Sequence, residues 1–211
     1  MMGLAPESYA IRMDVAPEMV WVDLETCGLL PEDRVLEIGI QVTNRHGDER
    51  STFQSVVGYA DFVLSDFTEL GPRGLSPVVH EMHTKNGLLD EVREASIITA
   101  NQPRAGFARV DVETRAIDFL TMNFGYLDVG LPMAGASVQF DRGVLNVQMR
   151  RLHNWFHYRQ YDVSTLLQLG DMTGNTPDES VQRRGFHRSV PDIEDEISVH
   201  RWAMQRLVTQ V

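Results

Sequence analysis

The chain has 211 residues and a mass of 23.9 kDa, which is enough for one domain with a hydrophobic core. Its 19 basic and 30 acidic side chains leave a net charge of −11, which argues against a protein that holds long nucleic acid through many phosphates. We expect a soluble, unsecreted protein, because the sequence contains no apolar run of about 20 residues and no charged-then-apolar leader. The single cysteine, Cys27, excludes an internal disulfide and fits a reducing cytoplasm.

The first third of the chain is typical of strands. Residues 1–18 contain two prolines and no sustained periodicity, so we expect an N-terminal extension followed by one domain over 19–211. Three short runs rich in β-branched and aromatic residues predict an antiparallel meander, at 19–24, 35–43 and 51–59. Gly28 and Pro31 mark a turn between the first two strands, and a polar loop is expected over 60–75.

From residue 76 onward the hydrophobic period changes to that of helices. Helices are predicted over 76–83, 86–95, 110–127, 141–152, from a Ser or Thr cap near 164, and over 189–208. One further strand is predicted over 132–138, and 170–185 is polar and rich in turn formers. Strands followed by alternating strands and helices indicate an α/β fold with a mixed sheet.

Four carboxylates occupy notable positions in this pattern. Asp23 and Glu25 end the first strand and point to the same face, about 7 Å apart along the chain. Asp141 follows the strand over 132–138, and Asp192 lies in the first turn of the last helix, five residues after His187. Taken singly, a strand end in solvent or a charge at a helix N-terminus explains each residue. Their combination points to a common site.

Such a set of side chains suits phosphoryl transfer with two metal ions. Mg²⁺ and Mn²⁺ prefer carboxylate oxygens, and two such cations can stabilise the attacking and leaving oxygens of an in-line displacement. A nearby histidine, with an ordinary pKa of about 6.5, can take a proton from the attacking water.

Five sequence stretches carry a family resemblance, namely WVDLETCGL, HTKNGL, GASVQFDR, FHYRQYDVSTL and HRSVPDI. Through them the chain resembles the DEDDh 3′→5′ exonucleases, and within these the oligoribonucleases, from about Val20 to Arg201. The resemblance implies a ribonuclease-H-like fold, a mixed central sheet flanked by helices. It also implies a homodimer that degrades short single-stranded oligoribonucleotides to 5′-mononucleotides with two divalent cations, Mg²⁺ or Mn²⁺.

The resemblance assigns roles to individual residues. The metal ligands are Asp23, Glu25, Asp141 and Asp192, and the general base is His187. The substrate-binding residues are Leu29 between the two bases, His83 near the 3′ end, and Ser137, Arg159, Ser164 and Thr165 around the 5′ phosphate. Tyr158 matches an aromatic supplied by the other subunit. The alternative for Tyr158 is a place in a dimer core beside Trp155 and Phe156.

The chain departs from the family pattern at three positions. Cys27 replaces a usual threonine, Pro191 replaces a frequent second aspartate, and Val78 stands where several members carry a base-stacking tryptophan. The last departure weakens strict dinucleotide preference. It leaves open an exonuclease of broader range, acting on DNA or on longer RNA 3′ ends. An inactive nucleic-acid-binding module is a further alternative, disfavoured because all four carboxylates and the histidine are present.

Two other clusters have ordinary explanations. The pairs His80/His83 and His153/His157 have helical ligand spacing, but neither has a third zinc ligand nearby in the sequence. Glu194, Asp195 and Glu196 are predicted to form a charged, solvent-facing surface of the last helix.

Overall fold

The computed structural model describes residues 18–61, 75–178, 181 and 184–208, and side chains up to residue 206. Of the extension predicted over 1–18, residues 1–17 lie outside the described part, as does most of the expected loop over 60–75, whereas Glu18 belongs to the first strand. The strands are β1 (Glu18–Thr26), β2 (Val35–Asn44), β3 (Glu49–Val56), β4 (Met133–Gly135) and β5 (Gln160–Asp162). The helices are α1 (Pro77–Lys85), α2 (Leu88–Asn101), α3 (Arg109–Phe124), α4 (Gln139–Gln148), α5 (Arg150–Trp155), α6 (Val163–Thr173) and α7 (Ser189–Ala203), which continues as the π-helical turn η4 (Met204–Val208).

The five strands form one mixed sheet in the order β3-β2-β1-β4-β5. β1, β2 and β3 pair antiparallel, as the meander predicted, whereas β4 pairs parallel with both β1 and β5. The predicted α/β class and mixed sheet are therefore confirmed. β1 is the central strand and is covered on both of its faces.

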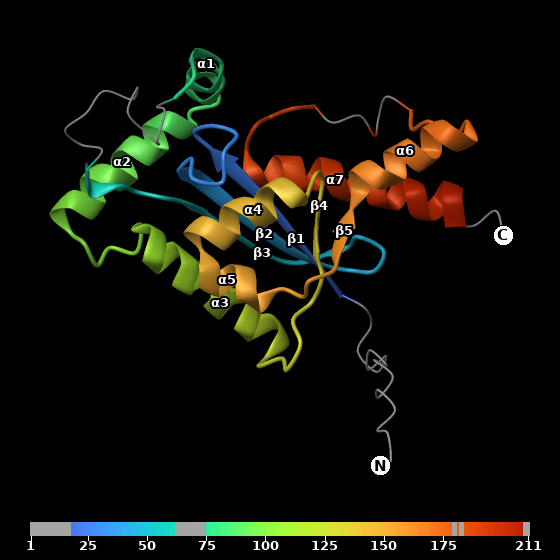
Figure 1. Cartoon of the computed structure of the whole chain (residues 1–211), viewed down its shortest axis with the longest axis horizontal. Helices are drawn as coiled ribbons and strands as arrows, with labels where there is room; N and C mark the ends of the chain where they lie inside the picture. The colour runs from blue at the N-terminus through green and yellow to red at the C-terminus, as the bar shows by residue number, and fades with distance from the viewer. Residues whose placement is uncertain (1–17, 62–74, 179–180, 182–183, 209–211) are drawn as a thin grey trace, which may run out of the picture.

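The two faces of β1 meet different helices (Figure 1). Val20, Val22 and Leu24 join a core with residues of α3, α4 and α5. Trp21 points to the opposite face and packs with Ile193 of α7. Since side chains alternate along a strand, Asp23 and Glu25 share the face that α7 covers. The strand that carries the Asp-x-Glu pair is thus held rigidly from both sides.

Several predicted boundaries change in the structure. The single helix predicted over 141–152 is wrong, because Met149 leaves the helical region (φ −133°, ψ 62°) and separates α4 from α5. The predicted Ser or Thr cap of α6 is also wrong. Asp162 ends β5 and caps α6 instead, and its Oδ1 accepts a hydrogen bond of 2.9 Å from the Ser164 N–H.

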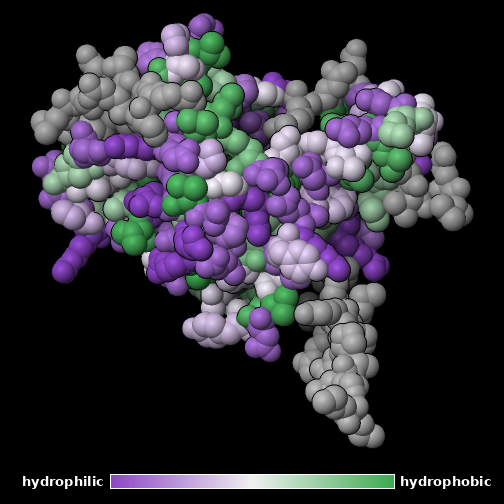
Figure 2. Space-filling view, viewed as in Figure 1, coloured by the Kyte–Doolittle hydropathy of each residue, from purple (hydrophilic) through white to green (hydrophobic). Residues whose placement is uncertain are grey.

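The outer surface is largely polar. Figure 2 shows polar side chains over most of the face seen in Figure 1, with hydrophobic side chains in small separate groups. Among the described helices, none has the length and apolar character that crossing a membrane requires.

Candidate active site

Three carboxylates converge between β1 and α7. Asp23 and Glu25 come from β1 and Asp192 from the first turn of α7, and one oxygen of each lies within 4.8 Å of the others. The start of α7 can approach the sheet this closely because Gly39 of β2 has no side chain. A Cβ at Gly39 would lie 2.7 Å from the Ser189 hydroxyl oxygen. A small residue in β2 therefore allows α7 to deliver Asp192 to the end of β1.

The fourth predicted ligand, Asp141, reaches the same region from α4. β4 pairs with β1 only at Val20 and Trp21, so the backbone of β1 extends beyond its neighbour. Asp141 Oδ1 accepts a hydrogen bond of 3.1 Å from the Leu24 N–H in this extension. Asp141 is buried, and its carboxylate takes the position that a longer β4 would occupy.

The clustered charges change the acidity of Glu25. Burial raises its pKa first, and repulsion from Asp23, Asp192, Glu37 and Asp141 raises it further, to about 9. Like charges in a buried site cannot all ionise unless a cation neutralises them. Oxygen ligands of this kind fit a hard divalent cation, so the residues present suit Mg²⁺ or Mn²⁺.

His83 of α1 adjoins this cluster. Its ring is fully buried, and its Nε2 lies 3.6 Å from Glu25 Oε2. Burial, and then the nearby charge of His187, lower the pKa of His83 to about 4. The metal-competent group found among the described residues consists of carboxylates, and His80 is exposed, so the geometry does not favour zinc.

His187 lies on the segment that leads into α7, opposite α1. The imidazole is exposed and lines a cavity of about 510 Å³ together with Val78, Met82 and Phe186. Its backbone has a φ of 53°, which is uncommon for a residue with a side chain. The structure thus places His187 at the surface beside α1, close enough to His83 for its charge to lower the pKa of that imidazole.

The predicted phosphate-binding residues divide into two places. Ser137 and Ser164 follow the ends of β4 and β5, and the Ser137 N–H donates to Ser164 Oγ at 3.1 Å. Thr165 is exposed on the first turn of α6. Arg159 precedes β5 and therefore lies at the opposite end of that strand, with its guanidinium 5.6 Å from the centre of the exposed Tyr158 ring.

Leu29 projects from a braced turn after β1. Its side chain is 82% exposed, although leucine is apolar. Within the turn the Leu30 N–H donates to Asp33 Oδ2 at 2.8 Å, and Gln148 of α4 donates to the Pro31 carbonyl at 2.9 Å. An exposed leucine on a fixed turn is available for contact with a ligand.

Glu37 is a buried carboxylate that was not among the predicted site residues. It is the cross-strand partner of Glu25, and it accepts hydrogen bonds from Arg188 at 2.7 Å and from the Ser189 N–H at 2.8 Å. Burial opposes its ionisation, but these partners outweigh burial and lower the pKa of Glu37 below its ordinary value. The sequence did contain a sign of this position, because side chains alternate along β2 and Glu37, Gly39 and Gln41 therefore lie on one face.

The predicted solvent-facing charged surface on the last helix is wrong for two of its three residues. Glu194 is exposed, but Asp195 and Glu196 are buried. Asp195 binds Arg184, and Glu196 Oε1 accepts a hydrogen bond of 2.9 Å from the Ala136 N–H after β4. Glu196 lies four residues after Asp192, so helical spacing already placed both on one face.

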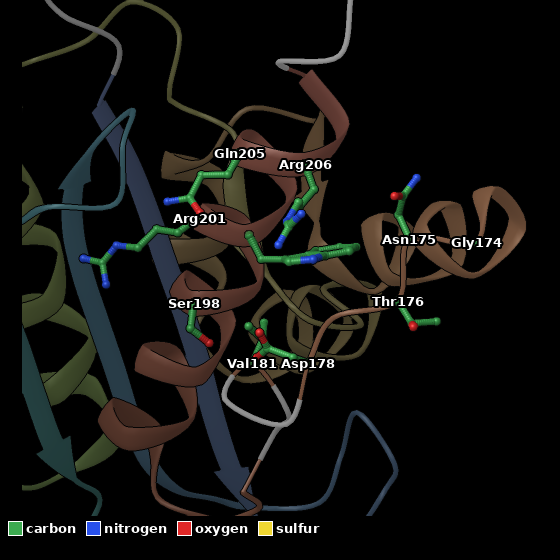
Figure 3. Close-up of a pocket in the computed structure, with 10 residues that line it drawn as sticks. Gly174, Asn175, Thr176, Asp178, Val181, Ser198, Arg201, Gln205 and Arg206 are labelled. Atoms are coloured by element: carbon green, nitrogen blue, oxygen red, sulfur yellow. The ribbon is translucent and has the colours of Figure 1, made fainter.

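A separate cavity of about 430 Å³ lies near the other end of α7 (Figure 3). Its lining includes Asn175, Trp202 and Arg206, and none of the predicted site residues. Arg201 points away from Arg206 in Figure 3 and donates to the Gly47 carbonyl at 2.7 Å. This cavity is remote from the carboxylates, which lie at the end of β1 and in the first turn of α7.

Comparison with known proteins places the chain in a family. It is 30% identical over 186 residues to the oligoribonuclease of Shewanella amazonensis, covering 87% of this chain and 91% of that protein. It is 32% identical over 187 residues to the oligoribonuclease of Neisseria meningitidis serogroup B, covering 87% and 88% respectively. The chain belongs to the oligoribonuclease family. In a separate comparison with protein-family models, no model matches this chain.

Comparison with solved structures tests the ribonuclease-H-like fold that was expected from the sequence. Exonuclease I of E. coli in complex with a dT13 oligonucleotide superposes with a TM-score of 0.58 at 14% identity. Exonuclease I from Methylocaldum szegediense superposes with a TM-score of 0.57 at 17% identity. The matches cover 92% and 90% of this oligoribonuclease-family chain, but only 42% and 40% of the exonuclease I chains. The ribonuclease-H-like fold expected from the resemblance is confirmed.

Proposed function

We propose that the chain is a metal-dependent 3′→5′ exonuclease that degrades very short RNA to 5′-mononucleotides. The observation that carries the proposal is the convergence of Asp23, Glu25 and Asp192 within 4.8 Å in a member of the oligoribonuclease family. The raised pKa of Glu25 supports it, because these buried carboxylates need a cation to be ionised together.

In this proposal Asp23, Glu25, Asp141 and Asp192 would hold two divalent cations, Mg²⁺ or Mn²⁺. When bound, the cations would supply stabilisation of the negative charge that develops during in-line displacement at phosphorus. Asp141 is oriented for its part by the Leu24 N–H, and Asp192 by the rigid start of α7. His187 acts as general base and takes a proton from the attacking water at its imidazole nitrogen.

The remaining residues would bind the oligonucleotide. Leu29 inserts between two bases, which its exposure on a braced turn supports. Ser137, Ser164 and Thr165 would supply hydroxyl groups for the terminal 5′ phosphate. Arg159 would supply the cation that such a pocket requires, and it would have to reach the phosphate from the opposite end of β5, where it lies beside Tyr158. His83, buried beside Glu25, borders the 3′ end of the substrate.

We also propose that the protein acts as a homodimer. Tyr158 is 74% exposed at the same end of β5 as Arg159, and a second copy would place this ring at the partner's site. A dimer is expected in sedimentation equilibrium. A monomer with full activity would contradict the role given to Tyr158.

The test is digestion of a length ladder of 5′-labelled RNA, starting at the dinucleotide, with matching DNA. Millimolar Mn²⁺ or Mg²⁺ should release 5′-mononucleotides from RNA, fastest from the shortest members, and a chelator should stop the reaction. Equal rates on DNA and long RNA would instead support the exonuclease of broader range. Binding of the ladder without any cleavage would support the inactive module.

A further inference from the structure

The segment that carries His187 is anchored at both ends. Before it, the Arg184 Nε donates to Asp195 Oδ1 of α7 at 2.9 Å, and the Arg184 N–H donates to Asp195 Oδ2 at 2.7 Å. After it, Arg188 forms ion pairs with Glu37 of β2 at 2.7 Å and with Glu91 of α2 at 2.9 Å. These contacts fix where the segment begins and ends, but none of them touches His187 itself.

The backbone between these anchors is held by Asn86. Its Nδ2 donates to the His187 carbonyl at 2.6 Å and to the Phe186 carbonyl at 3.3 Å. A side-chain amide carries two N–H donors, so one group can satisfy both carbonyls. The φ of 53° at His187 is a left-handed conformation that side chains disfavour, and such a conformation persists only where the surroundings hold it.

The other half of the Asn86 amide faces the helices. Its Oδ1 accepts a hydrogen bond of 3.0 Å from the Leu88 N–H at the start of α2. The Asn86 backbone N–H donates to the Met82 carbonyl and closes α1. Asn86 therefore stands at the rigid junction of α1 and α2, three residues after His83, which contacts Glu25.

We propose that Asn86 is a positioning residue for His187, which it orients by holding two successive carbonyls of the strained segment. The inference rests on the proposed function, because it assumes that His187 is the general base. Without the two hydrogen bonds from Nδ2, the segment between Arg184 and Arg188 relaxes from its left-handed geometry. The imidazole then spends less time in reach of the attacking water, and a displacement of about 1 Å can cost about 10²-fold in rate.

The decisive variant is Asn86→Asp. Aspartate keeps the oxygen that accepts from Leu88 but lacks the donors to the two carbonyls, so it separates capping of α2 from positioning of His187. We expect kcat for the RNA dinucleotide to fall by about 10²-fold, with KM, the Mn²⁺ dependence and Tm nearly unchanged. Asn86→Ser, whose hydroxyl still accepts at short range, should lose kcat similarly. The matched control is Asn101→Asp in α2, where the amide donates only to the Ile97 carbonyl.

A double-mutant cycle tests whether Asn86 acts through His187. In a His187→Ala background, Asn86→Asp should have almost no further effect on kcat, because the group that Asn86 orients is gone. Full additivity of the two losses would overturn the proposal, as would full kcat in both Asn86 variants. A His187→Ala protein with undiminished kcat would instead refute the general base in the proposed function. If the fall in kcat of Asn86→Asp is accompanied by a matching fall in Tm, Asn86 is a structural residue and the proposal is wrong.

Discussion

Glu25 and Glu37 face each other across β1 and β2, and both are buried, yet they behave as different groups. The neighbours of Glu25 are mainly carboxylates, and its pKa rises to about 9. Glu37 is bound by Arg188 and Ser189, and its pKa falls below the ordinary value. One strand pair thus carries a carboxylate whose surroundings disfavour its ionised form and another whose ionised form is stabilised by an arginine of the chain.

Burial alone therefore does not identify a metal site. Two buried glutamates in register differ because of what the start of α7 brings to each. Arg188 reaches Glu37, and Asp192, four residues later, reaches Glu25. A buried carboxylate with its own arginine is a structural ion pair, whereas a buried group of carboxylates is a candidate metal site.

The largest effect is expected from removing one of the carboxylates that cluster around Glu25. Asp192→Asn should lower kcat by on the order of 10³-fold, because bound cations supply several kcal/mol of charge stabilisation. The readout is release of mononucleotides from an RNA dinucleotide at saturating Mn²⁺. Glu194→Gln, an exposed neighbour on the same helix, is the control and should stay fully active. Equal activity of both variants would remove Asp192 from the site.

Glu37, which is paired with Arg188, should instead affect the stability of the fold. Arg188→Met leaves Glu37 buried without its cation, and breaking such a pair costs about 3–5 kcal/mol of unfolding free energy. Urea unfolding measures the loss. The double variant Arg188→Met with Glu37→Leu should recover much of it, since no unpaired charge remains. If the single variant is as stable as the wild type, Glu37 does not depend on Arg188.

Glu25→Gln should stabilise the metal-free protein, whereas Arg188→Met should destabilise it. In the metal-free protein Glu25 holds its proton up to a pKa of about 9, whereas the unfolded chain releases it near 4.5. The stability that this group contributes is therefore complete below pH 4.5 and is lost as the pH rises toward 9. Glu25→Gln should flatten this slope and raise the metal-free Tm at pH 8 by about 2–4 °C per kcal/mol. It should also abolish stabilisation by Mg²⁺, which calorimetry would measure.

The smallest effect is expected from changing Glu91, the more exposed of the two ion-pair partners of Arg188. Glu91 is 48% exposed, and an exposed ion pair contributes less than about 1 kcal/mol to stability. Glu91→Gln should therefore shift the urea midpoint only slightly. A loss of unfolding free energy as large as that of Arg188→Met would show that Glu91, rather than Glu37, is the main stabilising partner of Arg188.

Much of the fold and site could be predicted because the signals are local. The alternation in β1 already placed Asp23 and Glu25 on one face, and runs of β-branched residues indicated the antiparallel meander. The break at Met149 could not be predicted, since the hydrophobic pattern of 141–152 continues through it. The burial of Asp195 also could not be predicted, because its partner Arg184 lies eleven residues away in a turn-rich segment.

The strand and helix periods, the carboxylate positions and the membership in the oligoribonuclease family can all be read from the amino-acid sequence. These depend on neighbouring residues and on residue identity. Three other features depend on how the chain packs: which carboxylates share a cluster, which one is paired with an arginine, and how Asn86 contacts the His187 segment. Those pairings join residues that are up to about 170 positions apart, so they follow from the packing of α7 against the sheet rather than from any local pattern.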